Sequence, residues 1–383
     1  MPNSFRAWLD QIEHFAHDAH HKGVLFERFI AAYLQTDPLY ADQLEAVWRY
    51  PDWPDRPEHW KADNLGFDLI AKTHSGEYWA IQCKFYDRDS RIDKEAITNF
   101  TSDSERRFAV EGIEQRFSYR LLVTTQDALG KQAEEATTDL PDFGVLYLRD
   151  LELAPIDWTQ FSWGAPGTLV RKPGKALRAH QREAIQSVLH GFERYDRGQL
   201  IMACGTGKTF TSLKLMEQMV SNDGLVLFLA PSITLVSQTL REWVEQAESP
   251  MHAFVVCSDN QVGQAEDDPD LRVVDLAYPA TTDMTKLASA LKGARRDRRR
   301  VIFSTYQSIQ AVIDAQKAAG LPDFDLVVCD EAHRTTGVSV GEYESDFVKV
   351  HRNDLLRARK RLLHRENAGE SQRETGGPLL HGR

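Results

Sequence analysis

The chain has 383 residues, of which 42% are hydrophobic, and a formal net charge of −11 at pH 7. This length predicts two or three domains with packed cores, and the acidic balance excludes a surface that binds nucleic acid by overall positive charge. No stretch approaches the roughly 18 consecutive apolar residues of a membrane span. The four cysteines include no Cys-x-x-Cys pair and the N-terminus shows no charged-then-apolar leader, so we expect reduced thiols and a cytoplasmic location.

Residues 1–153 alternate helical and strand patterns, which predicts a small α/β domain with a mixed sheet. Glu27 lies among hydrophobic neighbours in the first helical pattern, so it is either solvated or part of a site. Residues 48–60 are rich in Pro, Trp and Asp and predict a surface loop. The remaining patterns predict helices at 5–35, with a break near Lys22–Gly23, at 94–104 and at 128–137, a β-hairpin at 63–85, and strands at 117–125 and 144–148.

Polar side chains gather on the predicted hairpin. Gln82 and Lys84 are two residues apart and project from one face of a strand, and Asp68 on the neighbouring strand can reach that face. These groups suit Mg²⁺-dependent cleavage of a phosphodiester. Asp68 ligates the metal, the Gln82 amide oxygen and the Cys83 carbonyl can assist, and Lys84 orients or deprotonates the attacking water. The alternative is an ordinary amphipathic hairpin, or a nuclease fold without activity.

The stretches 66–70, Gly-Phe-Asp-Leu-Ile, and 82–86, Gln-Cys-Lys-Phe-Tyr, together resemble the Mrr-like branch of the PD-(D/E)xK nucleases. The resemblance covers roughly residues 20–150. In that branch a glutamine commonly replaces the second acidic residue, and a glutamate on a helix joins the site. The resemblance therefore implies that Glu27 binds metal together with Asp68, and that Glu27, Asp68, Gln82 and Lys84 are catalytic.

A second α/β pattern follows a linker expected over residues 154–176, where prolines and glycines gather. Its centre is the stretch 202–209, Met-Ala-Cys-Gly-Thr-Gly-Lys-Thr, between an apolar strand pattern and an amphipathic helix. The N–H groups of Gly205, Thr206 and Gly207 and the helix N-terminus face phosphate oxygens in such a turn. Lys208 supplies positive charge for the β- and γ-phosphates, and Thr209 places its hydroxyl on Mg²⁺. The stretch predicts ATP binding, with Met202 where the strict pattern has glycine.

Two further positions complete the predicted nucleotide site. Gln181, on a helical pattern before the loop, can both donate and accept hydrogen bonds, as the edge of adenine requires. Asp330 and Glu331 follow the apolar strand pattern 324–329, and a carboxylate at the C-terminal end of such a strand faces the nucleotide crevice. We expect Asp330 to hold Mg²⁺ through water, and Glu331 to polarise the attacking water.

The order of these motifs, with Ala230-Pro231-Ser232 and Ser304-Thr305-Tyr306-Gln307 between them, resembles the first RecA-like domain of superfamily 2 (DEAH-box) helicases. The nearest similarity is to the motors of type I and type III restriction enzymes. The resemblance implies that Ser232 and Thr305 line the track of the nucleic-acid backbone, and that His333 couples the nucleotide site to that track. The basic run 295–300 either contacts DNA phosphates or is a solvated turn.

The C-terminal part departs from this resemblance. A Ser/Thr-Ala-Thr motif and a second RecA-like domain with arginine fingers are implied after Asp330, and neither is found in the sequence. From Glu366 onward the sequence is rich in Gly, Arg and Glu and has no apolar period. We therefore expect the RecA-like domain to cover 177–362 and residues 363–383 to be disordered, in a reading frame that is shifted or cut near Arg361–Leu363. Because ATP sites of this class lie between two such domains, we expect slow ATP hydrolysis by this chain.

The sequence thus predicts a restriction-endonuclease-like mixed-sheet domain followed by a single RecA-like parallel-sheet domain with a P-loop. This order resembles the front end of single-polypeptide, type I-like restriction–modification enzymes, in which a methyltransferase and a target-recognition domain follow the motor. The leading hypothesis is an ATP-dependent DNA restriction endonuclease, or its N-terminal fragment, that cleaves double-stranded DNA with Mg²⁺. The alternatives are a repair-type helicase–nuclease and a non-catalytic remnant that binds DNA and ATP.

Overall fold

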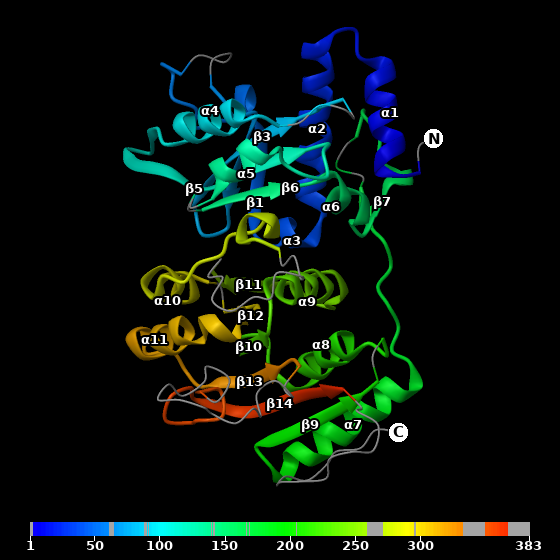
Figure 1. Ribbon diagram of the computed structural model, residues 1–383, viewed down its shortest axis with the longest axis vertical. Coiled ribbons are helices and arrows are strands. Elements are labelled where there is room, and N and C mark those ends of the chain that lie inside the picture. The colour runs from blue at the N-terminus through cyan, green and yellow to red at the C-terminus, as the bar shows by residue number, and fades with distance from the viewer. Residues whose placement is uncertain are drawn as a thin grey trace. The chain divides into compact units, whose positions relative to one another are not determined.

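The computed structural model describes residues 3–60, 65–87, 90, 92–138, 140, 142–165, 167, 169–203, 205–258, 271–294, 296–331 and 349–366. The chain divides into two compact units (Figure 1). Unit 1 comprises Met1–Pro173 together with Val274–Pro279, and unit 2 comprises Gly174–Val273 together with Ala280–Arg383. Each unit combines helices with a six-stranded sheet, so the predicted α/β class is confirmed. Among the described residues, no helix has the length and apolar character needed to cross a membrane.

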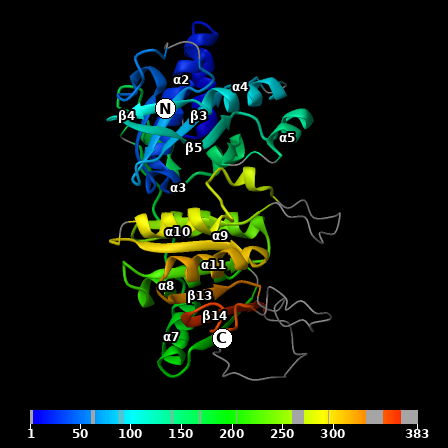
Figure 2. The ribbon, with the colours of Figure 1, turned by 90° about the vertical axis from the view of Figure 1, so that its left-hand side faces the viewer.

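The sheet of unit 1 is mixed, as predicted. β2 (Leu69–Thr73) and β3 (Tyr78–Lys84) form the expected antiparallel hairpin, and β1 (Leu44–Arg49) pairs with β2. On the other side β3, β5 (Ile113–Thr124) and β6 (Phe143–Leu146) are parallel, with β4 (Arg107–Val110) antiparallel to β5. The helices are α1 (Phe5–Phe15), α2 (Ala19–Thr36), α3 (Pro38–Ala41), α4 (Lys94–Ser104), α5 (Lys131–Thr137) and α6 (Leu148–Leu153). Figure 2 shows α4 and α5 side by side.

The first helical pattern breaks earlier than predicted. The chain leaves the helix at Ala16–Asp18, and Asp18 caps α2 by accepting a 2.7 Å hydrogen bond from the His21 N–H. Gly23 lies inside α2. A glycine in a helix destabilises it by roughly 0.5–1 kcal/mol, and the packing of the apolar residues of α2 outweighs this cost. The predicted helix break near Lys22–Gly23 is therefore wrong. Asp18, as an N-cap residue, was the stronger signal for the start of the second helix.

The stretch 48–60 is not the surface loop that its Pro and Asp content predicted. Tyr50, Trp53 and Trp60 are buried, and the Trp53 ring lies edge-on to Phe108 with centroids 5.0 Å apart. The segment lacks long helices or strands, yet its rings supply a large share of the core on this side of the sheet. Their partners in that core include Phe67, Ile70, Tyr78, Phe100, Phe108, Phe117 and Phe143.

Most of the segment predicted as a linker also belongs to unit 1. β7 (Ile156–Asp157) pairs with β8 (Val170–Arg171), so both ends of this segment belong to a small sheet. Trp158 is buried with its ring 5.0 Å from that of Phe29, and its carbonyl accepts a 3.0 Å hydrogen bond from the Trp8 indole. The prolines and glycines therefore mark turns within the domain, and the two units meet in sequence at Pro173–Gly174.

Six residues far downstream in sequence, Val274–Pro279, complete the core of unit 1. Val274 packs in its aromatic cluster, and the Tyr147 hydroxyl lies 2.9 Å from the Asp275 carboxylate. The Tyr40 hydroxyl donates to the Ala277 carbonyl over 2.9 Å, and Ala277 has a positive φ of 51°. No sequence pattern predicted this contribution, because nothing in a short segment identifies a partner more than a hundred positions away.

Gly144 on β6 gives a test of that packing. A Cβ at this position would lie 3.0 Å from Cζ of the buried Tyr119 and 3.1 Å from Cα of Ala277. We predict that Gly144→Ala lowers the free energy of unfolding of unit 1 by about 1–3 kcal/mol, because neither neighbour can move without disturbing the core. Thermal unfolding measures this. The control is Gly23→Ala, because a Cβ at Gly23 would have no atom within 4 Å. Gly112→Ala is unsuitable as a control, because Gly112 has a positive φ that strains an alanine. Equal melting temperatures for Gly144→Ala and the parent chain would contradict it.

Unit 2 is a parallel sheet in the order β11-β12-β10-β13-β14-β9, as expected for a RecA-like domain. Figure 1 shows α8 and α9 on one side of this sheet and α10 and α11 on the other. The strands are β9 (Arg197–Met202), β10 (Leu225–Ala230), β11 (Met251–Val256), β12 (Arg299–Thr305), β13 (Phe324–Cys329) and β14 (Ala358–Glu366). The helices are α7 (Ala179–Arg194), α8 (Lys208–Met219), α9 (Ile233–Gln246), α10 (Met284–Gly293) and α11 (Ile309–Ala319).

β14 corrects the prediction that order ends at residue 362. Residues 358–366 form an interior strand, paired in parallel with β13 on one side and β9 on the other. The strand was missed because Arg359, Lys360, Arg361 and Arg365 give it a polar composition. Leu362 and the Arg361 side chain are nevertheless buried, and the Arg361 guanidinium donates to the carbonyls of Val350 and Leu356. Residues 367–383 lie outside the described part of the chain.

Candidate nuclease and nucleotide sites

Asp68 lies directly before β2, at the end of the hairpin away from its turn. Its N–H donates to the Ile81 carbonyl over 2.8 Å, and its Oδ2 accepts a 2.7 Å hydrogen bond from the Cys83 N–H. Burial raises the pKa of Asp68 to about 6, helped by the negative charge of Glu27 and opposed by the Cys83 hydrogen bond and the charges of Lys84 and Arg49. The structure thus gathers three charged side chains around one partly desolvated carboxylate.

Gln82 and Lys84 stand two apart on β3, beside Asp68. The Gln82 amide nitrogen donates to the Gly66 carbonyl over 2.5 Å, while its Oε1 is buried and has no hydrogen-bond partner among the described residues. A buried amide oxygen without a donor is a costly arrangement unless something else binds it. Lys84 is half-buried, and its charge acts on Asp68. The structure therefore places all three predicted residues at one end of the hairpin, and their catalytic roles stay predictions.

Glu27, on α2, reaches the same cluster. Its Oε2 lies 2.9 Å from Nε of Arg49, at the end of β1, and both side chains are largely buried. Sequence analysis missed Arg49 because β1 was not predicted and the supposed surface loop began at residue 48. The apolar residues between Leu44 and Trp48 were the signal that could have found this strand. Arg49 offsets the negative charge of a site that holds two carboxylates close together.

The donor set fits a hard divalent cation, which prefers oxygen ligands. Glu27 and Asp68 supply carboxylates, and Gln82 supplies the buried Oε1 that accepts no hydrogen bond from a described residue. Within the described residues no three His, Cys, Asp or Glu side chains gather in a metal-binding group. The fit therefore depends on the glutamine, which takes the place of a third acidic residue.

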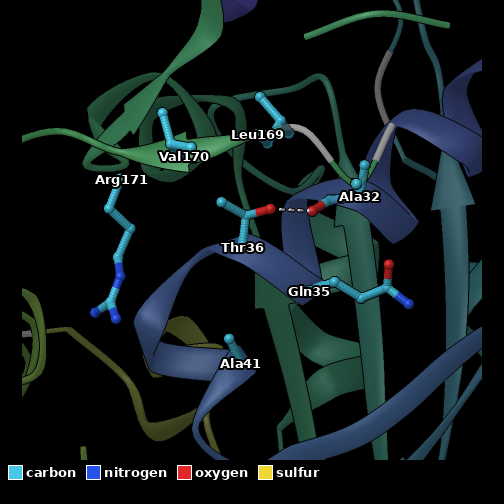
Figure 3. Close-up of a pocket in the computed structure, with 8 residues that line it drawn as sticks. Ala32, Gln35, Thr36, Ala41, Leu169, Val170 and Arg171 are labelled. Carbon is cyan, nitrogen blue, oxygen red and sulfur yellow. Dashed lines mark hydrogen bonds between the residues drawn. The ribbon is translucent and has the colours of Figure 1, made fainter. Parts of the chain in front are cut away.

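A separate cavity of about 490 Å³ opens at the C-terminal end of α2 (Figure 3). Among the described residues that line it there is no carboxylate and none of the predicted site residues, and Arg171 is the only charged one. The chemistry of the site is therefore in the charged cluster rather than in this cavity. Its lining is Ala32, Gln35, Thr36, Ala41, Gly167, Leu169, Val170 and Arg171.

The predicted phosphate loop has the backbone that such a cradle needs. Gly205 and Gly207 have φ of 72° and 88°, values that favour glycine, and Gly207 is the N-cap of α8. Thr206 closes the turn by donating through its N–H and its hydroxyl to the Ala203 carbonyl. Lys208 is the first residue of α8, and Thr209 follows it. The helix N-terminus is therefore free of a side-chain cap, as anion binding there requires.

Gln181 contacts the loop itself. Its Nε2 donates to the Thr206 carbonyl over 3.0 Å, and its Oε1 accepts from the Arg178 N–H over 2.9 Å. A Cβ on Gly207 would lie 2.6 Å from Nε2, so the glycine is required for this contact as well as for its φ. Both hydrogen-bonding edges of the amide are used by the protein in this structure. Contact of Gln181 with adenine stays a prediction, which the observed hydrogen bonds do not favour.

Asp330 follows β13 and faces the loop. The pKa of the Asp330 carboxyl is lowered: burial opposes this, but the hydrogen bond and electrostatic interaction with His364 and the charge of Lys208 outweigh it. Its backbone carbonyl accepts a 2.8 Å hydrogen bond from the Tyr306 hydroxyl. Glu331 next to it has a φ of 49°, a strained value for a glutamate of the kind found at functional sites. Lys208 and Asp330 are thus close enough to interact, as a nucleotide site requires.

Of the three residues predicted to contact DNA, Ser232 and Thr305 lie in the described part of the chain. Ser232 caps α9, with its Oγ accepting from the Leu235 N–H over 3.3 Å. Thr305 is only 4% exposed and its hydroxyl donates to Ser308, so contact with DNA would require this hydroxyl to leave the core. His333 lies outside the described residues. In the basic run, Arg299 and Arg300 begin β12 and donate to main-chain carbonyls of the unit, so these two arginines belong to a strand and not to a solvated turn.

Comparisons with known proteins agree with this division. Residues 35–168 match the family described as "Restriction endonuclease", and residues 174–355 match the family described as "Type III restriction enzyme, res subunit". The chain therefore carries a restriction endonuclease domain followed by a helicase-type ATPase domain.

Solved structures of Type ISP restriction-modification enzymes are similar to this chain. The solved structure of the "ATP-dependent Type ISP restriction-modification enzyme LlaBIII bound to DNA" is 34% identical, with a TM-score of 0.78, over 95% of this chain and 22% of that one. A nuclease-deletion mutant of the Type ISP enzyme LlaGI, with a DNA substrate mimic, is 38% identical over 50% of this chain and 17% of that one, with a TM-score of 0.41. A probable helicase of African swine fever virus (isolate Pig/Kenya/KEN-50/1950) is 28% identical over 50% of this chain and 20% of its own length. The chain thus spans about a fifth of these relatives.

Proposed function

We propose that this chain is the nuclease and motor part of an ATP-dependent DNA restriction endonuclease. Unit 1 hydrolyses phosphodiester bonds of double-stranded DNA with Mg²⁺, and unit 2 binds ATP with Mg²⁺. The observation that carries the proposal is the charged cluster around Asp68 in a domain of restriction endonuclease type, followed in the same chain by a glycine loop facing Asp330. The likeness to an enzyme solved on DNA supports duplex DNA as the substrate.

In unit 1, Asp68, Glu27 and the Gln82 amide oxygen would hold Mg²⁺, which supplies Lewis-acid activation of the phosphate and of water. Lys84 orients the attacking water and offsets the negative charge that develops on the phosphate. Arg49 holds Glu27 over 2.9 Å and keeps two carboxylates in one place despite their repulsion. The Cys83 N–H fixes the rotamer of Asp68.

In unit 2, the N–H groups of the loop and the Lys208 ammonium bind the phosphates of ATP, while Thr209 and Asp330 would hold Mg²⁺. Glu331 polarises the attacking water. For this 383-residue chain by itself we propose slow hydrolysis, because the residues around Asp330 and Lys208 form one face of the site and charges from a second face supply much of the catalysis in this class. We propose methyltransferase and target-recognition functions as its partners in a cytoplasmic restriction system.

The experiment is cleavage of supercoiled plasmid by the full chain with Mg²⁺, with and without ATP. We expect nicking that needs Mg²⁺ and falls by roughly 10²–10⁴-fold in Lys84→Ala, since a positioned proton-transfer group contributes that much. The matched control is Lys72→Ala on the neighbouring strand, whose ammonium pairs with Glu45 over 3.0 Å and which should cleave normally. Lys208→Ala should lose ATP binding only. Absence of Mg²⁺-dependent cleavage in the parent chain would favour the non-catalytic alternative.

A further inference from the structure

His364, on β14, is the feature of the nucleotide site that the sequence motifs do not contain. β13 and β14 pair in parallel with Cys329 opposite Leu363, so the next residue on each strand brings Asp330 and His364 together. The His364 Nδ1 lies 3.1 Å from the Asp330 Oδ1. An ionised carboxylate only accepts hydrogen bonds, so Nδ1–H is the donor.

Among the described residues, the Asp330 carboxylate is the one hydrogen-bond partner of the imidazole ring. The ring is 1% exposed and lies edge-on to Phe228, with ring centroids 6.3 Å apart. Its Nε2 is buried and makes no hydrogen bond to any described residue. A ring held by packing on one side, with a single polar contact on the other, fixes one rotamer of the carboxylate that it touches.

We propose that His364 is a positioning residue of the nucleotide site: it binds one oxygen of Asp330 so that the other stays directed toward Mg²⁺ of the bound ATP. This inference rests on the proposed binding of ATP by unit 2. It assigns a role to a strand that lies between β13 and β9, adjacent to the strands that carry Asp330 and the phosphate loop. Such outer partners of a metal ligand typically change metal affinity by about 10–100-fold when removed.

Because the contact acts on the metal ligand, its loss should reduce the contribution of Mg²⁺ to the affinity for ATP. The contacts of the loop with phosphate should be unchanged. The test is calorimetric titration of the full chain with ATP, in excess Mg²⁺ and in EDTA. We expect His364→Ala to weaken binding about tenfold in Mg²⁺ and to leave it nearly unchanged in EDTA. If His364 has only a structural role, His364→Ala should lower the melting temperature and weaken ATP binding equally in Mg²⁺ and in EDTA. That result would overturn the proposal.

Two conservative variants keep the test decisive if the alanine variant unfolds. The amide nitrogen of His364→Asn falls near the place of Nδ1 and should restore the Mg²⁺-dependent part of the affinity. The longer His364→Gln places its amide near Nε2 and should not. Equal affinities for the two variants in Mg²⁺ would also overturn the proposal. A parent chain whose ATP binding is absent, or is unaffected by Lys208→Ala, would instead refute the proposed function itself.

Discussion

Replacing Asp68 by asparagine should make unit 1 more stable while abolishing cleavage. The pKa of this carboxyl rises from the ordinary 3.8 to about 6 on folding, so the folded state holds the proton more tightly than the unfolded chain. The stabilising effect of that proton is complete below about pH 3.8 and is lost as the pH rises through about 6. Above this range the ionised group destabilises the fold by roughly 3 kcal/mol, at 1.36 kcal/mol for each pKa unit.

Asparagine carries no charge and can still accept the hydrogen bond from the Cys83 N–H. In metal-free buffer we therefore expect Asp68→Asn to unfold at a higher temperature than the parent chain at pH 8 and at the same temperature near pH 4. Calorimetric melting with EDTA at the two pH values measures this. Added Mg²⁺ should stabilise the parent chain and not the variant, and cleavage of plasmid should fall by more than about 100-fold because a metal ligand is lost.

The control is Asp87→Asn, a carboxylate that is mostly exposed and pairs with Lys22 over 3.1 Å at the surface. It should change neither cleavage nor melting by a comparable amount, since surface ion pairs contribute little. A destabilised Asp68→Asn at pH 8, or a variant that still gains stability from Mg²⁺, would show that Asp68 is not the buried, metal-directed group described above.

The sites that could be predicted are those whose chemistry lies in short segments. Strand, loop and helix follow one another around Lys208, and Gln82 and Lys84 lie on one strand, so local spacing was enough to name them. Arg49 and His364 could not be named in this way. Each acts through a residue distant in sequence, Glu27 or Asp330, and the contact exists only after the strands have paired. The segment 274–279 in the core of unit 1 is a further case of the same limit.

Two of the misjudged elements share a physical cause, namely a composition that conceals burial. The stretch 48–60 has the prolines and aspartates of a loop, yet its large rings enter the core. β14 has the charges of a disordered tail, yet those charges find partners. The buried Arg361 guanidinium binds two main-chain carbonyls, and Arg359 lies 2.8 Å from Asp325. Composition measures average polarity, whereas burial depends on whether each polar group can be satisfied.

Removing β14 should therefore unfold unit 2. We expect a chain ending at Arg357 to lose ATP binding and the unfolding transition of unit 2, while a chain ending at Glu366 keeps both because it retains the strand. Melting followed by calorimetry and ATP titration measure the two properties, and the transition of unit 1 serves as the internal control.

The size of this effect follows from the position of the strand in the sheet. Without β14, the facing edges of β13 and β9 lose their hydrogen-bond partners, and the core loses Leu362 and Leu363. Deleting one buried leucine side chain typically costs about 2–5 kcal/mol, and the free energy of unfolding of a whole domain is only about 5–15 kcal/mol. We therefore expect the combined losses to exceed the free energy of unfolding of unit 2. If the chain ending at Arg357 still bound ATP and melted cooperatively, β14 would be a peripheral strand and His364 could not have the role inferred for it.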